Sequence, residues 1–480
     1  MEIQKWFNNS IFLARDADWV FIIKNGNSKE EMIKAFEDYL SNFKGSKITD
    51  YSLNVYSQSS FIPTNKFTFL GNRIDICEHY KNGPYYPVIE PLYRAHYKYN
   101  IDFAQVFINK VNSMGIRPWL TLRMNDSHYL IDGLGLMQSD EFHRALALGK
   151  VIGEQYGYFR NNPDFSNKEY TDSLLSYIEE ILNKYDIYGL DLDFLREIYC
   201  FDYKSNPDCH KIMTEFIRNI KAIISEAEKL HKHKIRLLIR TNRSPKDSME
   251  FGFDIKTMCE KKLIDAISPG PRWECADSAI PIKEWREICG EDIGIIFGLE
   301  TLNLHGSFTT INQAKAYSAA FYAQGANGIY LSNYFDVNDR NKAIWNFTPE
   351  NVLSGTRNFT VTYQDISSGS FTPYNPLPFS FDGEYSFDLE VGKIEANNKV
   401  KIIINFKGDD LPKLSVNGAK ESEAHKIDPL IIYDCLRETN RNLTPDIPVS
   451  FETCGIETKS PLTLFFKGSG TIDYIDIIIE

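Results

Sequence analysis

The chain has 480 residues, of which 43% are hydrophobic and 25% are charged, and its formal net charge is −12. This composition excludes an intrinsically disordered chain, and a single core rarely exceeds about 300 residues, so two domains are expected. An acidic chain without a basic run does not have the electrostatics of a nucleic-acid binder.

Short β-rich runs alternate with longer helical patterns between about residues 15 and 345. The strands expected in chain order are Trp19–Lys24, Asp50–Tyr56, Gly115–Arg123, Ile187–Phe194, Ile235–Arg240, Leu263–Ser268, Ile293–Glu300 and Gly328–Asn333. The spacing of apolar residues predicts helices over Glu30–Phe43, Phe103–Met114, Tyr170–Lys184, His210–His231 and Ile311–Gln324. Eight strands alternating with helices predict a closed (β/α)8 TIM barrel of class α/β, and a doubly wound open sheet is the alternative. The stretch 57–100 is too long for an ordinary loop, so it is either functional or contains extra elements.

A different pattern begins after about Pro349. Short runs of alternating apolar residues, such as Val400–Phe406 and Pro461–Phe466, are separated by turn residues, and the sequence shows no long helical pattern there. This is typical of an antiparallel β-sandwich. The predicted organisation is a catalytic barrel over residues 1–349, followed by a β-sandwich accessory domain over residues 350–480.

The sequence carries no recognisable targeting or membrane signal. Residues 1–7 lack the basic and apolar regions of a signal peptide, and no apolar run approaches the roughly 18 residues of a membrane span. The eight cysteines are scattered without a CxxC pair, which favours free thiols. The chain as it stands is therefore predicted to be cytoplasmic, or exported if a leader has been removed, with no membrane partner.

A TIM barrel places its chemistry at the carboxyl ends of the strands, on the loops that follow them. Polar and aromatic residues gather at these positions. The candidates for substrate contact are Asn54, Gln58, Arg123, Asn125, Asp126, His128, Asp191, Arg196, Arg240, Arg243, Trp273 and Asn333. Hydrogen bonding to sugar hydroxyls and stacking on Trp273 are the expected roles, and ion pairing of the arginines with barrel carboxylates is the alternative.

The fourth expected strand, within Gly189–Glu197, carries two acidic residues on one face. Asp191 and Asp193 lie two residues apart, while the apolar residues between and around them take the other face. Because the apolar face should contact the helices, both carboxylates are expected inside the barrel, where repulsion raises one pKa. A carboxylic acid that stays protonated near neutral pH is a candidate general acid.

Glu300 ends the seventh expected strand and should lie across the barrel mouth from Asp193. In glycosidic cleavage one carboxyl group protonates the leaving oxygen, and a second attacks or activates water. Asp193 is therefore the candidate general acid/base and Glu300 the candidate nucleophile or second base, with Glu197 in reserve for either role. A structural role in ion pairs or hydrogen bonds is the alternative for each of these carboxylates.

Several other chemistries are disfavoured. The sequence has no phosphate-binding glycine loop, GxSxG elbow or P-loop, so nucleotide-dependent and serine-hydrolase reactions are not expected. Asp126 and His128 lack a clear third ligand, so neither a metal nor another cofactor is expected. The rival interpretations are a non-catalytic glycan-binding barrel and a metal-dependent lyase or isomerase on the same fold.

Four segments also carry a resemblance to a known family, and they are Ile48–Gln58, Arg117–Asp126, Tyr185–Arg196 and Gly325–Asn333. Over about residues 45–335 the chain resembles bacterial glycoside-hydrolase-like barrel proteins with a DGIELDFMR-type fourth strand. This resemblance implies glycosidase-type chemistry on an oligo- or polysaccharide without naming the sugar. The fourth strand is also similar to the DxxDxDxE motif of chitinase-type hydrolases. However, Leu195 stands where that motif has its acid, so a chitinase mechanism assisted by a substrate acetamido group is not expected.

Overall fold

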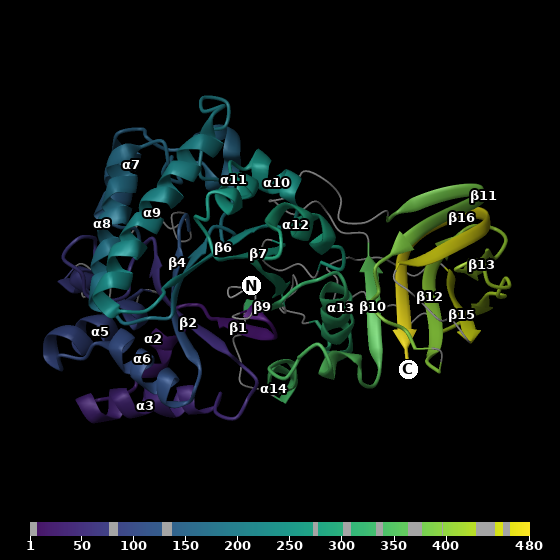
Figure 1. Cartoon of the computed structure of the whole chain (residues 1–480), viewed down its shortest axis with the longest axis horizontal. Helices are drawn as coiled ribbons and strands as arrows, with labels where there is room; N and C mark the ends of the chain where they lie inside the picture. Colours follow the sequence, from purple (N-terminus) through teal and green to yellow (C-terminus); the bar gives the residue numbers. More distant parts are fainter. Residues whose placement is uncertain are drawn as a thin grey trace.

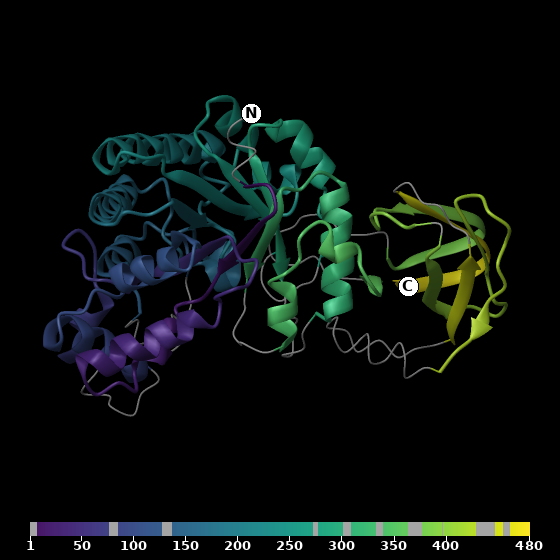
Figure 2. The ribbon, with the colours of Figure 1, turned by 60° about the horizontal axis from the view of Figure 1, so that its bottom comes forward.

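The structure is a computed structural model of the whole chain, and its two bodies lie side by side (Figure 1). It describes residues 7–75, 85–126, 137–271, 277–300, 309–332, 339–362, 377–395, 397–428, 447–454 and 461–480. One body is a ring of parallel strands wrapped by helices, and the other is an antiparallel β-domain. Helix α13 (Ile311–Ala323) lies on the side of the barrel that faces the β-domain, as Figure 2 also shows.

The barrel strands pair in parallel in the order β1-β9-β8-β7-β6-β5-β4-β2, and β1 also pairs with β2, which closes the ring. These strands are β1 (Ser10–Ala14), β2 (Asp50–Ser57), β4 (Arg117–Arg123), β5 (Gly189–Asp193), β6 (Arg236–Asn242), β7 (Ala266–Gly270), β8 (Gly294–Glu300) and β9 (Gly328–Ser332). The predicted (β/α)8 barrel is therefore confirmed, and the open sheet is ruled out by the closing pair of strands.

Helices cover the outside of the ring. Those predicted from apolar spacing are α3 (Lys29–Ser41), α6 (Phe103–Ser113), α8 (Lys168–Lys184), α9 (Cys209–His231) and α13. The other described helices are α2 (Trp19–Ile23), α5 (Tyr86–Tyr93), α7 (Asp140–Ala147), α10 (Pro245–Glu250), α11 (Ile255–Glu260), α12 (Ile282–Cys289) and α14 (Asp339–Ile344). Each long helix turns an apolar stripe toward the strands, as α8 does with Leu174, Ile178 and Ile181. None of the described helices has the length and apolarity needed to cross a lipid bilayer.

The long stretch 57–100 contains extra elements. They are the two-residue strand β3 (Ser59–Ser60), the 3-10 turn η1 (Leu70–Arg73), α5 and the π-helical turn η2 (Arg94–Lys98). β3 folds back on the end of β2 in antiparallel pairing. The start of this stretch therefore lies beside the carboxyl end of β2.

The strand expected at Trp19–Lys24 is wrong, because this segment forms helix α2. The first strand of the ring is β1, which lies before it in the sequence. An alternating strand would bury Trp19 and Phe21 on the same face. Instead Trp19 and Val20 are buried while Phe21 is 45% exposed, and this is the spacing of a helix.

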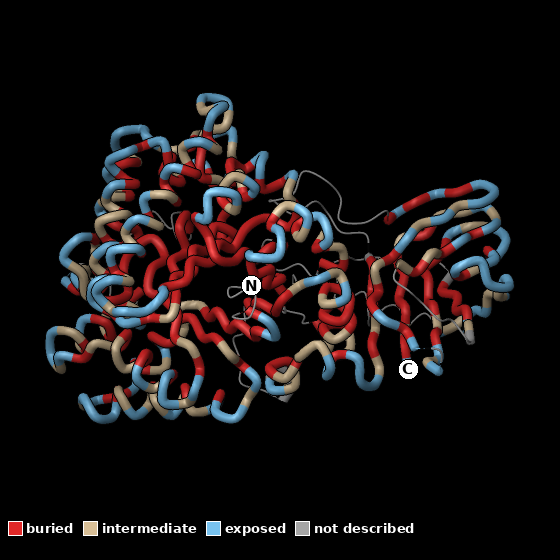
Figure 3. Tube along the Cα trace, viewed as in Figure 1, coloured by how far each residue is buried: buried red, intermediate tan, exposed pale blue. Residues whose placement is uncertain are grey.

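The interior of the barrel is apolar near the amino ends of its strands. The side chains that fill it there are Phe7, Phe12, Trp119, Leu238, Ala266, Ile296 and Tyr330. The rings of Phe12 and Tyr330 stack with their centroids 5.0 Å apart. The whole ring of strands is buried (Figure 3). This apolar layer lies below the polar side chains at the carboxyl end, while Asp50 and Arg117 form an ion pair at the amino end.

The carboxyl-terminal domain is antiparallel, which confirms the predicted β-sandwich. Its strands are β10 (Arg357–Thr362), β11 (Phe379–Leu389), β12 (Lys399–Lys407), β13 (Lys413–Val416), β14 (His425–Lys426), β15 (Ile447–Cys454) and β16 (Leu462–Ile479). β16 joins the two layers, because its first half pairs with β11 and β13 and its second half pairs with β10 and β12. The boundary at residues 349 and 350 stays a prediction.

The two domains meet where β10 packs on α13. Gln313 Nε2 donates to Thr360 Oγ1 at 3.1 Å, and the Tyr317 hydroxyl donates to the Thr360 carbonyl at 2.9 Å. The backbone of Gly392 lies so close to Ala319 that a Cβ there would meet backbone atoms at 2.9 Å. The domains therefore share a packed interface and are not separated by an open linker.

Candidate active site

Asp193, the last residue of β5, is held by three neighbours as a carboxylate. Its Oδ1 accepts hydrogen bonds from the backbone N–H groups of Leu195 (2.9 Å) and Arg196 (3.1 Å). Arg240 Nη1, from β6, lies 3.1 Å from Oδ2. Donors from β6 and from the loop after β5 therefore converge on both oxygens of Asp193 and fix the orientation of its side chain.

Arg240 lies within electrostatic reach of both Asp193 and Glu300. Glu300 ends β8 and is buried. Burial opposes the charge of Arg240, but the carboxylates of Asp193 and Glu300 and the nearby Tyr330 outweigh it, so the pKa of Arg240 is raised. The guanidinium also lies over the ring of Tyr330, 5.5 Å from its centroid. Two of the carboxylates predicted from the sequence are therefore within electrostatic reach of one buried cation.

Asp191 lies one layer deeper in the barrel. Its Oδ2 accepts hydrogen bonds from Tyr330 (2.7 Å) and Thr121 (2.8 Å). Burial, with a further contribution from Asp193, raises the pKa of Asp191 to about 7. This is the raised pKa expected from the paired aspartates, but the group that carries it lies below the mouth of the barrel.

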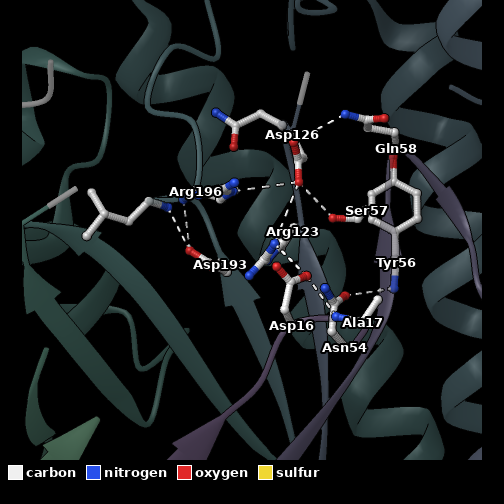
Figure 4. A network of polar contacts seen from close by, with 12 residues as sticks. Asp16, Ala17, Asn54, Tyr56, Ser57, Gln58, Arg123, Asp126, Asp193 and Arg196 are labelled. Atoms are coloured by element: carbon white, nitrogen blue, oxygen red, sulfur yellow. Dashed lines mark hydrogen bonds and ion pairs between the residues drawn. The ribbon is translucent and has the colours of Figure 1, made fainter. Parts of the chain in front are cut away.

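A second cluster of charges lies at the ends of β2 and β4 (Figure 4). Arg123 Nη1 lies 2.9 Å from Asp16 Oδ1 and 3.9 Å from Asp126 Oδ2. Arg196, from the loop after β5, lies 4.0 Å from the same oxygen of Asp126. Burial would raise the pKa of Asp16, but Arg123 and Arg196 outweigh this effect and lower it. Asp16 is therefore an ionised carboxylate near neutral pH.

The end of β2 holds Asp126 from the other side. Ser57 Oγ donates to Asp126 Oδ2 at 2.8 Å, and Gln58 Nε2 donates to Oδ1 at 3.2 Å. Gln138 Nε2 in turn donates to Gln58 Oε1 at 3.0 Å. Gln58 adopts a φ of 76°, a left-handed conformation that costs energy for a residue other than glycine. The hydrogen bonds on both sides of its amide hold it there.

A cavity of about 320 Å³ opens beside this cluster. Its lining combines polar and apolar residues and comprises Asp16, Ala17, Asp18, Phe21, Ser57, Gln58, Phe61, Val88, Arg123, Asp126, Met137 and Arg196. This volume lies at the lower end of the range for small-molecule sites. A smaller cavity of about 10 Å³, which Asp193 and Arg240 help to line, shares Arg123 and Arg196 with it. The smaller space suits a single water molecule.

The structure brings many of the predicted residues together and turns others away. Those in the two connected clusters are Gln58, Arg123, Asp126, Asp191, Asp193, Arg196, Arg240 and Glu300. Asn125 instead donates to Cys200 Sγ at 3.2 Å, and Arg243 pairs with Asp277 at 2.6 Å. The predicted His128, Trp273 and Asn333 lie outside the described residues.

Two other predicted residues stay beside the site. Glu197 is fully buried and is not part of the lining of either cavity. Asn54 Oδ1 accepts from the backbone N–H of Tyr56 at 3.1 Å, which ties its amide to its own strand. Their proposed roles remain predictions.

Asp16 and Asp18 are cavity residues that the sequence reasoning missed. Both lie between β1 and α2, in a segment placed before the first expected strand. The sequence does contain a pattern that indicates a strand end here, because the largely apolar run Ser10–Ala14 is followed within four residues by Asp16 and Asp18. Because the first strand was predicted at Trp19–Lys24, Asp16 and Asp18 were not predicted to follow the end of a strand.

No group of three or more His, Cys, Asp or Glu side chains in the described part of the chain is arranged to hold a metal ion. The carboxylates of the site are engaged instead by arginines, hydroxyls and backbone N–H groups. The chemistry that this site supports with its own residues is acid–base and electrostatic.

Comparisons with known proteins give similarity in structure alone. No family model matches the chain, and no curated protein is similar to it in sequence. The glycoside hydrolase domain of PgaB (BpsB) from Bordetella bronchiseptica is 10% identical, with a TM-score of 0.45 over 70% of this chain and 97% of that one. Chitinase ChiW from Paenibacillus sp. is 8% identical, with a TM-score of 0.42 over 97% of this chain and 53% of that one.

A cycloisomaltooligosaccharide glucanotransferase from Paenibacillus sp. is 9% identical, with a TM-score of 0.35. The match covers 97% of this chain and 57% of that one, so this chain spans little more than half the length of two of the three proteins. The barrel fold is established by the pairing of its own strands, independently of these similarities.

Proposed function

We propose that the chain hydrolyses glycosidic bonds in an oligo- or polysaccharide at the carboxyl-terminal mouth of its barrel. The observation that carries this proposal is the cavity of about 320 Å³, in which carboxylates and arginines share the walls with Phe21 and Phe61. Aromatic faces suit sugar rings, and charged side chains suit their hydroxyl groups.

Asp193 and Glu300 are the carboxylates proposed to act with the substrate, and Glu197 is held in reserve. The three donors at Asp193 support its use as a carboxylate that attacks the anomeric carbon or takes a proton from water. The small cavity beside it provides room for that water. Gln58, Arg123, Asp126, Arg196 and Arg240 are proposed to bind the sugar or to hold the carboxylates.

The experiment that tests this function measures reducing-sugar release from a broad panel of glycans and aryl glycosides. Asp193→Asn and Glu300→Gln are each expected to lower kcat by roughly 10²–10⁴ on a cleaved glycan. Asp265→Asn is the matched control, because Asp265 is a buried aspartate that pairs with Arg236 at 3.2 Å beside the amino end of β7. It should keep the turnover of the folded protein.

Three outcomes contradict the proposal in different ways. Full activity in both Asp193→Asn and Glu300→Gln shows that the roles are assigned to the wrong residues. Glycan binding by the unaltered protein with no cleavage across the panel shows that the barrel binds glycans without hydrolysing them. Activity that a chelator abolishes supports a metal-dependent lyase or isomerase instead.

A further inference from the structure

Asp18 lies at the wall of the large cavity, and its side chain forms no hydrogen bond to the helix that follows it. It precedes the first residue of α2, at the position where an aspartate normally accepts a hydrogen bond from the backbone of the first turn. No such bond is formed here. The carboxyl group turns instead to the guanidinium of Arg15, with which it forms an ion pair.

The three carboxyl groups of the cavity differ in how many donors surround them. Asp126 has a donor on each oxygen, from Ser57 and Gln58. Asp16 Oδ1 accepts from the backbone N–H of Ala17 at 2.7 Å and from Arg123.

Asp18 is bonded by Arg15 through Oδ2, and within the described parts of the chain its Oδ1 accepts no hydrogen bond. That oxygen has room for a proton. Asp16 Oδ2 likewise accepts no hydrogen bond from the described residues, but Asp16 has two donors and Asp18 has one. Asp18 is therefore the cavity carboxyl whose surroundings least require the ionised form.

Burial and the charges around Asp18 act on its pKa in different directions. Burial raises the pKa of Asp18 to about 6, and the neighbouring Asp16 adds to this, while Arg15 and Arg123 oppose it. The phenols of Tyr39 and Tyr51, from α3 and β2, face the same ion pair. Asp16 and Asp18 thus share one cavity with pKa values moved in opposite directions, an arrangement that separates an ionised carboxylate from a protonated acid.

We propose that Asp18 is the carboxyl group that donates a proton to the departing glycosidic oxygen. This rests on the proposed glycosidase function. The proton passes from Asp18 to the glycosidic oxygen as the bond between that oxygen and the anomeric carbon breaks, and the bonding electron pair goes to the oxygen. Water adds to the anomeric carbon and loses one proton to a carboxylate of the site, which leaves an alcohol and a hemiacetal and no net change in protons. Arg15 stabilises the Asp18 carboxylate that remains.

Phe21 places the sugar next to this acid. It lies three residues after Asp18, on the same short helix, lines the same cavity and is 45% exposed. A sugar ring stacked on Phe21 would bring its linking oxygen to the wall that Asp18 forms. The proposed acid and the aromatic face therefore both belong to α2 and the residue that precedes it.

The test compares leaving groups, because a substrate with a good leaving group does not need protonation. Asp18→Asn is expected to lower kcat on oligosaccharides by roughly 10²–10⁴. On 2,4-dinitrophenyl glycosides of the same sugar the loss should stay within about tenfold, since that leaving group departs as a stable anion. The unaltered enzyme should lose kcat/KM above about pH 6, and this fall should be absent in Asp18→Asn.

Two further variants keep the result interpretable. Asp18→Glu keeps a carboxyl group beside Arg15, and partial recovery of oligosaccharide cleavage is expected even if Asp18→Asn folds poorly. Asp38→Asn alters an exposed aspartate on α3 that pairs with Lys34, and it should leave all rates unchanged.

Equal losses on oligosaccharides and on dinitrophenyl glycosides would overturn the proposal, because they indicate a positioning role. Unchanged oligosaccharide cleavage in Asp18→Asn would overturn it too, while leaving the glycosidase function intact. An unaltered protein that cleaves nothing in the panel refutes the glycosidase function itself, and the assignment of Asp18 with it.

Discussion

Arg236 and Arg240 lie four residues apart on β6, and each holds a buried aspartate at a different end of the barrel. Arg240 Nη1 lies 3.1 Å from Asp193 Oδ2 at the carboxyl end. Arg236 Nη1 lies 3.2 Å from Asp265 Oδ1 at the amino end. Both pairs are almost fully buried, and they differ in their place relative to the barrel mouth and in that Asp265 also pairs with Lys221.

Arg236→Ala and Arg240→Ala should both destabilise the fold, and Arg240→Ala alone should also lower turnover. Removing Arg240 leaves the buried Asp193 carboxylate without its ion-pair partner, which costs about 3–5 kcal/mol in the free energy of unfolding. The loss in Arg236→Ala should be smaller, because Lys221 Nζ still lies 3.0 Å from Asp265 Oδ2. Urea unfolding measures this loss, and kcat/KM per folded molecule measures the effect on the site. Equal losses of kcat/KM in the two variants would show that the pair at the mouth has no special part in catalysis.

Asp191 should make the barrel less stable as pH rises. Its pKa in the folded protein is about 7, above the value of about 3.9 expected in the unfolded chain. The folded state therefore binds this proton more tightly, so the contribution of Asp191 to stability is complete below about pH 4 and is lost as pH rises to about 7. The difference of about three pKa units corresponds to about 4 kcal/mol.

Asp191→Asn should remove this dependence. An amide oxygen at the position of Oδ2 can accept from Thr121 and Tyr330, as the protonated acid does. The variant should match the unaltered protein near pH 4 and exceed it in stability above pH 7, as measured by urea unfolding across that range. Asp172→Asn, at an exposed aspartate paired with Lys168, is the control. A stability difference that stays constant with pH would show that Asp191 is ionised throughout.

The sequence predicts the barrel well where its elements have strong periodicity. The helix expected at Tyr170–Lys184 is α8, Lys168–Lys184, because its apolar residues repeat at helical spacing over four turns. The alternation in β5 also places Asp191 and Asp193 inside the barrel, where the structure finds them. In these segments local pattern and tertiary burial agree.

The sequence fails where burial removes the pattern. β1 is buried at all five positions, so it shows no alternation that would mark it as a strand. Trp19–Ile23 is rich in residues that favour strands, yet tertiary packing makes it a helix. Asn125 and Arg243 follow strands as expected, but a position after a strand does not fix the direction in which a side chain points.

Phe21→Ala should weaken substrate binding without affecting the fold. Phe21 lines the cavity but is 45% exposed, so its removal should change the free energy of unfolding by less than about 0.5 kcal/mol. Loss of a stacking face should raise KM by roughly tenfold, equivalent to about 1.4 kcal/mol. Phe465→Ala is the matched control, because Phe465 is 42% exposed on β16 in the other domain. An unchanged KM in Phe21→Ala would place the sugar elsewhere.

Removing residues 350–480 should destabilise the barrel, because α13 is buried on both of its sides. Its residues from Ala316 to Phe321 are all buried, between the barrel strands and β10. Truncation would expose the face on which Tyr317 packs against Phe359, with ring centroids 5.7 Å apart. The truncated chain is expected to aggregate or to melt at a clearly lower temperature, as measured by calorimetry and size-exclusion chromatography.

Tyr317→Phe separates the hydrogen bond from the packing at this interface. It keeps the ring contact with Phe359 but removes the hydroxyl that donates to the Thr360 carbonyl at 2.9 Å. Its cost should be about 1 kcal/mol, far below that of truncation, because the apolar contact remains. A barrel of residues 1–349 that stayed soluble and fully active would contradict a packing role. The β-domain would then have to serve the enzyme in another way, such as by holding the glycan.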